Sequence, residues 1–319
     1  MHLLFIGYSR IVQKRVLPAL LKLSSVTSID IASRTSALKI SLPDKFKGEI
    51  FDNYDKALSK SKANLVYISI VNSAHAEWAE KALKRGFHVI VDKPSFTSID
   101  DTKRLADFSQ KYNLCLAEAT VFAYHPQIQA VKNVFSSINS EPTKLTATFS
   151  FPPLNHDDFR YKRESGGGAL WDLGPYAVAT GRLFFNDEPK EFFCRVCTRS
   201  GNDDIDTSFS MLAIYSEGRA MIGHFGFNTE YSNHLNILGT DVSIDIDRVY
   251  TIPAEMENEI HIKQHNKNTS LKTPKADSFS LFLQKVIEGI QKGDSRKFVE
   301  DLLSDASVLH RLRLIAFKG

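Results

Sequence analysis

The sequence contains little cysteine and no long apolar run. Three cysteines among 319 residues are too few for a disulfide framework. No stretch approaches the roughly 20 consecutive apolar residues that a membrane-spanning helix requires. The opening residues, MHLLFIGYSR, also lack the basic start and the longer apolar core of a secretion signal. We therefore expect a soluble cytoplasmic protein that has no membrane partner.

Neither sign of charge dominates the chain. It carries 40 Lys and Arg residues against 37 Asp and Glu residues, a formal net charge of +3. A nucleic-acid binder would need a concentrated basic stripe, so we expect no nucleic-acid partner. Hydrophobic residues make up 43% and charged residues 24%, as in ordinary globular proteins. The length favours two domains, at roughly 100–200 residues per domain.

The first third of the chain alternates short apolar runs with helical patterns. The expected strands are His2–Ile6, Ser28–Ala32, Leu65–Val71, Phe87–Val91 and Leu114–Ala117. The expected helices are Ile11–Leu23, Ala76–Lys84 and a segment from Ser98 to about Tyr112. Pro18 should kink the first helix. This alternation predicts an α/β protein with a doubly wound parallel sheet, in which ligands bind at the carboxyl ends of the strands.

A different pattern begins near Lys144. The expected strands are longer and often alternate apolar with polar residues, over 144–151, 191–199, 207–216, 219–227, 234–239 and 242–250. Glu217-Gly218 predicts a hairpin turn, and helices are expected over 169–185, 278–292 and 297–317. The pattern predicts an α+β domain with a mostly antiparallel sheet. We place the boundary near residues 119–121, which gives domains 1–120 and 121–319.

Two short segments stand at the ends of the first two expected strands. Gly7 lies where a dinucleotide fold carries G-x-G-x-x-G, but Ser9 and Val12 replace the later glycines. Ser33 and Arg34 follow the second strand. An acidic residue there would bind the ribose of NAD, whereas an arginine suits the 2′-phosphate of NADP. The plainer alternatives are an ordinary strand–turn–helix and a solvated loop arginine.

Two more segments carry candidate catalytic side chains. Asp92-Lys93-Pro94 ends a buried strand, where a lysine points toward the ligand edge and the proline makes a rigid exit. The segment Gly166–Tyr176 begins with three glycines, which permit a close backbone approach. Asp172 and Tyr176 are four residues apart and would share one face of a helix. The alternatives are a surface lysine in a turn and a glycine loop before a core helix.

Cys194 and Cys197 form a C-x-x-C pair within an expected strand. No second cysteine pair or histidine pair accompanies them, as a zinc site would require. We interpret both as ordinary strand residues and expect no metal.

Together these segments resemble the Gfo/Idh/MocA oxidoreductase family over nearly the whole chain. The family's Y-I-x-x-P-N-x-x-H and A-L-x-x-G-K-H-V-x-x-E-K-P runs are similar to Tyr67–His75 and Ala82–Pro94. Its E-A-F-x-x-R-x-H-P run is similar to Glu118–Pro126, and its G-G-G-A-L-x-D-x-G run is intact at Gly166–Gly174. The departures, where the family carries Gly, Pro, Glu and Arg, are Ser9, Val71, Asp92 and Ala123.

The resemblance implies a Rossmann domain, a C-terminal domain with a large open sheet, and a homo-oligomer, either a dimer or a tetramer. It implies an enzyme that transfers hydride between NADP, rather than NAD, and a sugar. The implied catalytic residues are Lys93, Asp172 and Tyr176. The implied cofactor-binding residues are Gly7, Ser9, Arg10, Ile11, Ser33, Arg34, Ile70, Asn72, His75, Asp92, Lys93, Glu118 and Arg160.

The chemistry of carbonyl reduction suits these side chains. A ketone that accepts hydride needs a proton on its oxygen, and a tyrosine hydroxyl, with an ordinary pKa of about 10, can give one. A nearby ammonium stabilises the phenolate and the developing oxyanion, so Lys93 is the expected partner of Tyr176. Asp172 would orient Lys93 or bind a substrate hydroxyl. The alternatives are a free-sugar or diol dehydrogenase and, from another class, a dinucleotide-sensing protein without turnover.

The segment from Phe225 to Tyr250 resembles family members that act on nucleotide-linked sugars, including 3-ketoreductases. Phe227, Tyr231 and Tyr250 would stack on a base or a sugar face, and Arg248 would pair with a phosphate. The alternative is that all four are ordinary sheet residues. We expect a nucleotide-linked keto-sugar as the substrate.

Overall fold

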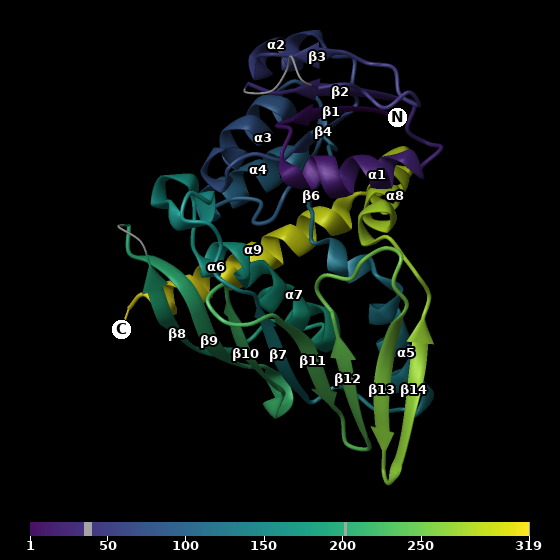
Figure 1. Ribbon diagram of the computed structural model, residues 1–319, viewed down its shortest axis with the longest axis vertical. Coiled ribbons are helices and arrows are strands. Elements are labelled where there is room, and N and C mark those ends of the chain that lie inside the picture. The colour runs from purple at the N-terminus through teal and green to yellow at the C-terminus, as the bar shows by residue number, and fades with distance from the viewer. Residues whose placement is uncertain (35–39, 201–202, 319) are drawn as a thin grey trace. The chain divides into compact units, whose positions relative to one another are not determined.

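The computed structural model of the chain describes residues 1–34, 40–200 and 203–318. The chain divides into two compact units (Figure 1). The first unit comprises Met1–Ala119 and Phe279–Leu303, and the second comprises Thr120–Ser278 and Ser304–Gly319. Within those described ranges, no helix is both long enough and apolar enough to cross a membrane.

The first unit is built on a six-stranded parallel sheet in the order β3-β2-β1-β4-β5-β6. Its strands are β1 (His2–Ile6), β2 (Ser28–Ala32), β3 (Ile50–Phe51), β4 (Leu65–Ile68), β5 (His88–Val91) and β6 (Leu116–Glu118). The strand order reverses direction between β1 and β4. In such sheets a ligand binds outside the carboxyl ends of the strands at that switch point. The prediction of a doubly wound parallel sheet is confirmed.

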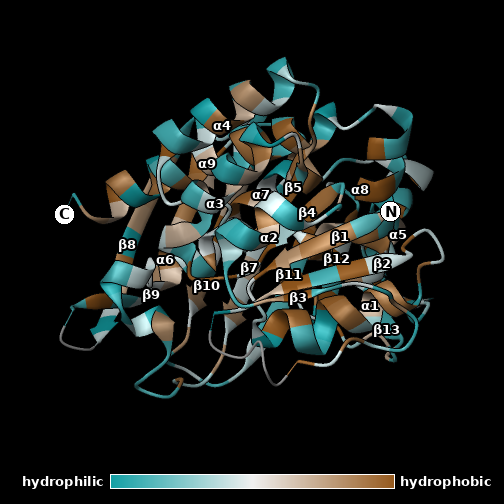
Figure 2. Ribbon diagram, turned by 90° about the horizontal axis from the view of Figure 1, so that it is seen from above, coloured by the Kyte–Doolittle hydropathy of each residue, from teal (hydrophilic) through white to brown (hydrophobic). Residues whose placement is uncertain are grey.

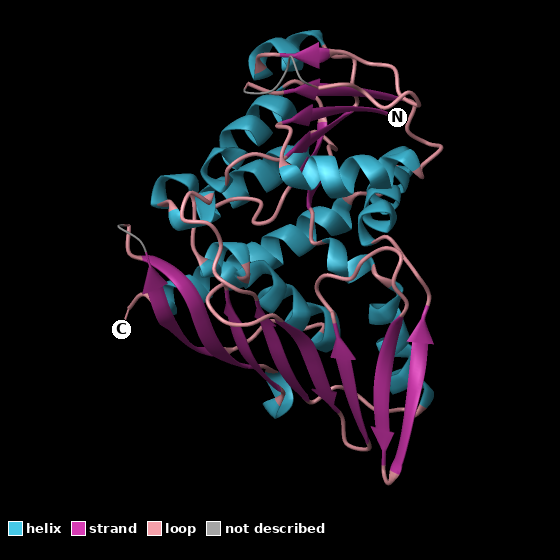
Figure 3. Cartoon of the chain, viewed as in Figure 1, coloured by secondary structure: helices cyan, strands magenta, loops and turns pink. Residues whose placement is uncertain are grey.

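Helices cover both faces of this sheet (Figure 3). They are a π-helical turn Val12–Val16, α1 (Leu17–Leu21), α2 (Tyr54–Lys60), α3 (His75–Lys84), α4 (Ile99–Lys111), α8 (Ser278–Lys292) and the first part of α9 (Arg296–Ala316). Leu4 and Ile6 share a core with residues of α2, α3, α4 and α9. Leu3 and Phe5 point to the opposite face and are equally unexposed. Figure 2 shows β1 as hydrophobic along most of its length, as a strand covered on both faces requires.

The structure adds elements to the first unit that the sequence pattern does not predict. β3 and α2 lie between the expected second and third strands. β3 has only two residues, too few to show a period. α2 begins after Asn53, whose side-chain oxygen accepts a hydrogen bond from Lys56 N at 2.9 Å. That N-cap fixes the start of the helix, as Ser98 does for α4 by accepting from Asp101 N at 3.2 Å.

The helix expected over Ile11–Leu23 has an irregular first half. A hydrogen bond from Leu17 N to Val12 O closes the π-helical turn. α1 follows, with Pro18 as its second residue, and the proline has no N–H to donate to the preceding turn. The expected kink is therefore a widened turn directly before the proline.

The second unit holds an eight-stranded sheet in the order β14-β13-β12-β11-β7-β10-β9-β8. Its strands are β7 (Lys144–Ser150), β8 (Glu191–Ser200), β9 (Ile205–Ile214), β10 (Ala220–Gly226), β11 (Ser232–Leu238), β12 (Val242–Asp247), β13 (Asn258–Gln264) and β14 (Lys267–Thr273). β7 and β10 pair in parallel, and the other neighbouring pairs are antiparallel. The predicted, mostly antiparallel open sheet is confirmed, although β13 and β14 lie in a polar stretch that predicts no strand.

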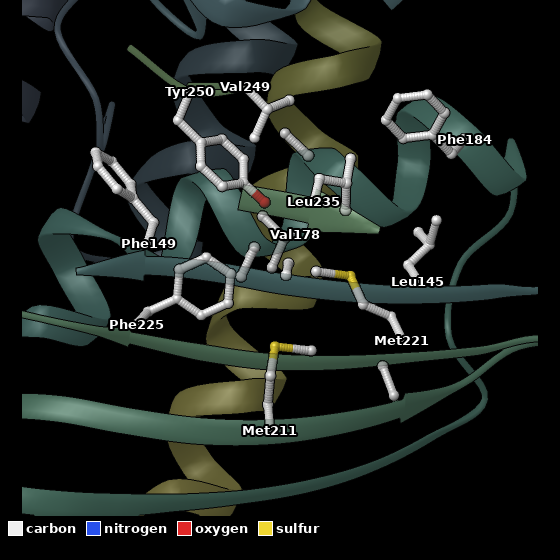
Figure 4. Close-up of a cluster of buried hydrophobic side chains, with 14 of the residues drawn as sticks. Leu145, Phe149, Val178, Phe184, Met211, Met221, Phe225, Leu235, Val249 and Tyr250 are labelled. Atoms are coloured by element: carbon white, nitrogen blue, oxygen red, sulfur yellow. The ribbon is translucent and has the colours of Figure 1, made fainter. Parts of the chain in front are cut away.

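One face of this sheet carries the core of the second unit (Figure 3). Residues of α5 (Pro126–Ser137), α6 (Ala169–Asp172), α7 (Gly174–Phe185) and the second half of α9 pack against it. Figure 4 shows part of this core, which includes the rings of Phe149, Phe225 and Tyr250 and the side chains of Met211 and Met221. Phe149 and Tyr250 stack with ring centroids 5.2 Å apart.

Two expectations for the second domain differ from the structure. The helix expected over 169–185 is broken at Leu173 into α6 and α7, because Pro175 at the start of α7 cannot donate a hydrogen bond back to α6. Residues 279–303, expected in the second domain, belong to the first unit. Val299 and Leu302 of α9 lie in the first unit's core, and Arg15 lies over the ring of Phe279.

We expect His125 to make the stability of the second unit depend on pH. It is 1% exposed, it caps α5 by accepting from Gln127 N, and burial lowers its pKa to about 4. The unfolded chain binds that proton near pH 6.5, so stability should fall as the pH drops from about 6.5 to 4, by up to about 3 kcal/mol. Asn caps helices without titrating. Urea unfolding of His125→Asn should show a shallower decline over this range, and an unchanged pH dependence would contradict the assignment.

Candidate functional site

The turn after β1 is shaped for a close backbone approach. Gly7 has a φ of 99°, in the region that favours glycine. A Cβ at this position would overlap the carbonyl oxygen of Ser69. Arg10 and Ile11, which begin the following helical segment, are exposed. The first N–H groups of a helix have no partner within it and attract anions, so this turn suits a phosphate.

Ser9 does more here than replace a glycine. Its Oγ accepts a hydrogen bond from Val12 N at 3.1 Å, which caps the helical segment. The same oxygen lies 2.7 Å from Ser69 Oγ, with which it shares a hydrogen bond. Ser69 Oγ in turn donates to Asp92 Oδ2. A chain of hydrogen bonds therefore links the turn after β1 to the end of β5.

Asp92 is half-buried, and both of its carboxyl oxygens accept hydrogen bonds from side chains of the β4 region. Tyr67 OH donates to Oδ1 at 2.7 Å, and Ser69 donates to Oδ2. Burial raises the pKa of the Asp92 carboxyl, while the two hydrogen bonds and the attraction of His75 and Lys93 oppose that rise. Burial and Asp92 together raise the pKa of Tyr67 well above its ordinary value, so Tyr67 remains a donor. Asp92 thus anchors the segment that carries Lys93.

Other expected cofactor-binding residues also brace this edge of the sheet. His75 is unexposed; its Nδ1 lies 2.9 Å from Pro94 O and its Nε2 lies 3.1 Å from Ile70 O. Glu118 accepts from Ser95 N at 2.6 Å, and Asn72 is buried. These contacts join the segments after β4, β5 and β6, so His75 and Glu118 hold the backbone that surrounds Lys93.

The end of β2 carries an aromatic support that the sequence does not suggest. Ser33 is buried, with its N–H donating to Phe51 O. The guanidinium of Arg34 lies over the ring of Tyr54, 4.8 Å from its centroid. Tyr54 itself packs edge-on against Trp78. Such stacking restrains the guanidinium and leaves its N–H groups available for hydrogen bonds.

The glycine run of the second unit is required by its surroundings. A Cβ on Gly167 would meet the carbonyl of Arg160, and one on Gly168, whose φ is 114°, would meet the Asp206 carboxyl. Asp206 Oδ2 accepts from Leu170 N at 2.7 Å and so caps the start of α6. Burial raises the pKa of this carboxyl, against the effect of that hydrogen bond. Asp206 lies directly before the strand expected over 207–216, in a polar stretch of sequence that does not indicate this contact.

Asp172 is paired with Arg160. Its Oδ2 accepts from Arg160 Nε at 2.8 Å, and Asp158 holds the Nη1 of the same guanidinium at 3.2 Å. Although burial opposes the charge, the two carboxylates raise the pKa of Arg160 further. Asp172 ends α6 and Tyr176 lies in the first turn of α7, so the two residues belong to different helices and the expectation of one helix carrying both was wrong. Asp172 orients Arg160.

Tyr176 projects from the first turn of α7 into an aromatic cluster. Its ring centroid lies 5.1 Å from that of Phe149, 5.3 Å from Tyr250 and 5.6 Å from Phe122. The side chain is half-buried. Three rings therefore fix the direction of the phenol.

The four residues expected to bind a nucleotide separate into two groups. Phe227 is unexposed and Tyr250 is 3% exposed; both are core residues, so their stacking role was wrong. Tyr231 is 41% exposed, and the guanidinium of Arg248 lies 5.4 Å from its ring centroid. Asn233 donates to Tyr231 OH at 3.2 Å and to Thr251 Oγ1 at 2.8 Å. Tyr231 and Arg248 remain able to contact a ligand.

The C-x-x-C pair is divided between two environments on β8. Cys194 is buried, which raises the pKa of its thiol to about 12, and Cys197 is exposed. Among the described residues, no group of three or more His, Cys, Asp or Glu side chains is arranged to hold a metal ion.

A parallel sheet of this order, with a glycine turn at its switch point, defines a dinucleotide-binding protein. Residues 1–120 match the model of an oxidoreductase family with an NAD-binding Rossmann fold, and residues 140–245 match the GFO/IDH/MocA C-terminal domain. The chain belongs to the GFO/IDH/MocA oxidoreductase family, as its motifs predict.

Similar proteins span almost all of the chain. It is 31% identical to a dTDP-3,4-didehydro-2,6-dideoxy-alpha-D-glucose 3-reductase of Saccharopolyspora spinosa, over 85% of this chain and 82% of that one. It is 29% identical to the reductase of the same name from Actinomadura kijaniata, over 97% of this chain and 93% of that one. A solved 3-ketoreductase of A. kijaniata, in complex with NADP and TDP-benzene, has a TM-score of 0.91 at 28% identity, with 99% of this chain and 98% of that one covered.

Proposed function

We propose that the protein is an NADPH-dependent reductase of a nucleotide-linked keto-sugar. The observation that carries the proposal is its similarity, over more than four-fifths of each chain, to reductases of dTDP-linked keto-sugars. Lys93 at the ligand edge of the first unit and Tyr176 in the aromatic cluster of the second support an active enzyme.

The residues of the first unit fit a dinucleotide with a 2′-phosphate. The cradle at Gly7 would be filled by any Cβ, and the helical segment behind it offers N–H groups to a pyrophosphate. Arg34, held over Tyr54, supplies a planar fork for the 2′-phosphate. When bound, NADPH supplies the hydride; the protein binds it, orients the substrate and provides the proton.

In this proposal Tyr176 donates its hydroxyl proton to the substrate oxygen as the carbonyl becomes an alcohol. The three surrounding rings fix the phenol so that its hydroxyl has a defined direction. Lys93 stabilises the negative charge that develops on oxygen, and its backbone is anchored by Asp92. Asp172 acts through Arg160, which it orients. These roles divide the chemistry between proton transfer and charge stabilisation.

Tyr231 and Arg248 are the proposed contacts for the nucleotide. The tyrosine ring offers a stacking surface, and the guanidinium beside it offers hydrogen-bond donors to a diphosphate. Binding energy from this remote part of the substrate positions the reacting carbon.

We also propose a homo-oligomer, a dimer or tetramer, formed through the large sheet. Phe193 of β8 and Ile222 of β10 are 58% and 57% exposed, and both neighbour Leu212 of β9 in the strand register. An exposed apolar strip of this kind favours association.

Arg34→Ala should weaken NADPH binding by about 10- to 100-fold and leave NADH binding unchanged. The variant loses a charge-assisted contact that only the 2′-phosphate receives. Fluorescence titration of both nucleotides measures the two Kd values. Arg85→Ala, at the carboxyl end of α3, is the matched control. An unchanged preference in Arg34→Ala would contradict the role of Arg34.

Tyr176→Phe should lower kcat by about 100-fold or more while the Kd for NADPH stays at its wild-type value. The substitution removes the proton donor and keeps the ring in its cluster, and a general acid contributes about 10²–10⁴-fold. Steady-state kinetics with a keto-sugar substrate measures kcat. Tyr112→Phe, on an exposed tyrosine at the end of α4, is the control. Wild-type turnover by Tyr176→Phe at every pH would remove Tyr176 from the mechanism.

A nucleotide-linked 3-keto sugar should be reduced with a much higher kcat/KM than the matching free sugar. Arg248→Ala should lower kcat/KM for the linked substrate by about tenfold or more, the scale of a lost charge-assisted hydrogen bond, without affecting the free sugar. Equal kcat/KM values for the two substrates in the wild type would instead favour a free-sugar or diol dehydrogenase.

A further inference from the structure

Ser69 is the meeting point of three segments at the ligand edge of the first sheet. It follows β4 directly and is 2% exposed. Its carbonyl occupies the space that a Cβ on Gly7 would need. Its hydroxyl shares a hydrogen bond with Ser9 and donates to Asp92. One buried side chain therefore connects the turn after β1 with the end of β5.

Tyr67 completes the environment of Asp92 from the same strand. Tyr67 and Ser69 are two residues apart, so both side chains leave the strand on the same side, and Tyr67 OH donates to the second carboxyl oxygen at 2.7 Å. The titratable groups that face Asp92 are Tyr67 from β4, His75 from α3 and the adjacent Lys93. His75 is fixed in turn by the carbonyls of Pro94 and Ile70.

We propose that Tyr67 and Ser69 are positioning residues that hold the Asp92 carboxylate, fix the segment carrying Lys93, and couple it through Ser9 to the turn after β1. Neither residue is expected to touch the substrate. The kinetic consequence rests on the proposed reductase function, whereas the control of Asp92 does not.

Loss of either hydrogen bond should change the pKa of Asp92 in one direction. Each hydrogen bond lowers the pKa of a carboxyl whose pKa is raised by burial, so loss of either bond should raise that pKa further. A larger fraction of Asp92 is then neutral at a given acid pH, and Lys93 loses the charge beside it. The acid limb of the kcat/KM profile should move to higher pH by about one unit, which is a tenfold change in the protonation equilibrium.

Two variants test the proposal at different oxygens of one carboxyl. Ser69→Ala removes the donor to Oδ2, and Tyr67→Phe removes the donor to Oδ1. If one variant fails to fold, the other still tests the proposal. Ser109→Ala is the matched control, because Ser109 is equally buried but donates to Ala106 O within α4.

The titration of Asp92 is read without substrate or cofactor. The full chain is labelled with [13C]aspartate, the Asp92 carboxyl is assigned with Asp92→Asn, and its ¹³C chemical shift is followed against pH. The pH profile of kcat/KM with NADPH is then recorded for the same variants.

The proposal holds if Ser69→Ala and Tyr67→Phe raise the pKa of Asp92 and shift the acid limb together by about one unit, while Ser109→Ala changes neither. It is overturned if the carboxyl titrates as in the wild type, or if it shifts and the acid limb does not. Should the wild type reduce no keto-sugar, the proposed function fails, and the NMR titration still decides whether Tyr67 and Ser69 control Asp92.

Discussion

The partly desolvated carboxyl of Asp92 is the constraint around which the ligand edge of the first unit is organised. A carboxylate removed from water is unstable unless hydrogen bonds and opposite charges replace its hydration. Tyr67 and Ser69 supply the hydrogen bonds, and His75 and Lys93 supply the attraction. The hydrogen bonds and charges that stabilise the Asp92 carboxylate thus constrain the positions of the ends of β4, β5 and α3. The position of Lys93 follows from that arrangement.

The same constraint explains why this chain carries serine where the dinucleotide motif has its second glycine. Ser9 caps the helical segment and joins Ser69, which already holds Asp92. A glycine would leave the turn able to bind phosphate but would break its connection to the Lys93 segment. The departure from the motif is therefore compatible with cofactor binding and adds a contact between two parts of the site.

The second unit uses buried acids in a similar way. Asp206 caps α6 and occupies the space that a side chain on Gly168 would need, and Asp172 orients Arg160. These contacts hold the broken helix whose second half carries Tyr176. The aromatic cluster of Phe122, Phe149 and Tyr250 then restricts the phenol. Polar contacts set the backbone and apolar rings set the side chain, so the geometry does not depend on a single interaction.

Local patterns in the sequence were sufficient for the main elements of both sheets. Hydrophobic runs located β1, β2, β4 and β5, and the Ser98 cap located α4, because periodicity and capping act over a few neighbouring residues. The two-residue β3 and the polar strands β13 and β14 were not predictable in this way. Their formation depends on pairing with strands that are distant in the sequence.

The motifs by themselves identified the family and led to the proposal of Lys93 and Tyr176 as catalytic residues, since they are contiguous runs of residues. Only the tertiary structure decided which partners those residues have. In the structure Phe227 and Tyr250 are core residues, and Asp172 pairs with Arg160. Tyr54 lies beneath Arg34. Ser9, Ser69 and Asp92 are joined by hydrogen bonds. The physical reason is that burial and hydrogen bonding join side chains from different strands and loops, and no local pattern records which distant residue will satisfy a buried polar group.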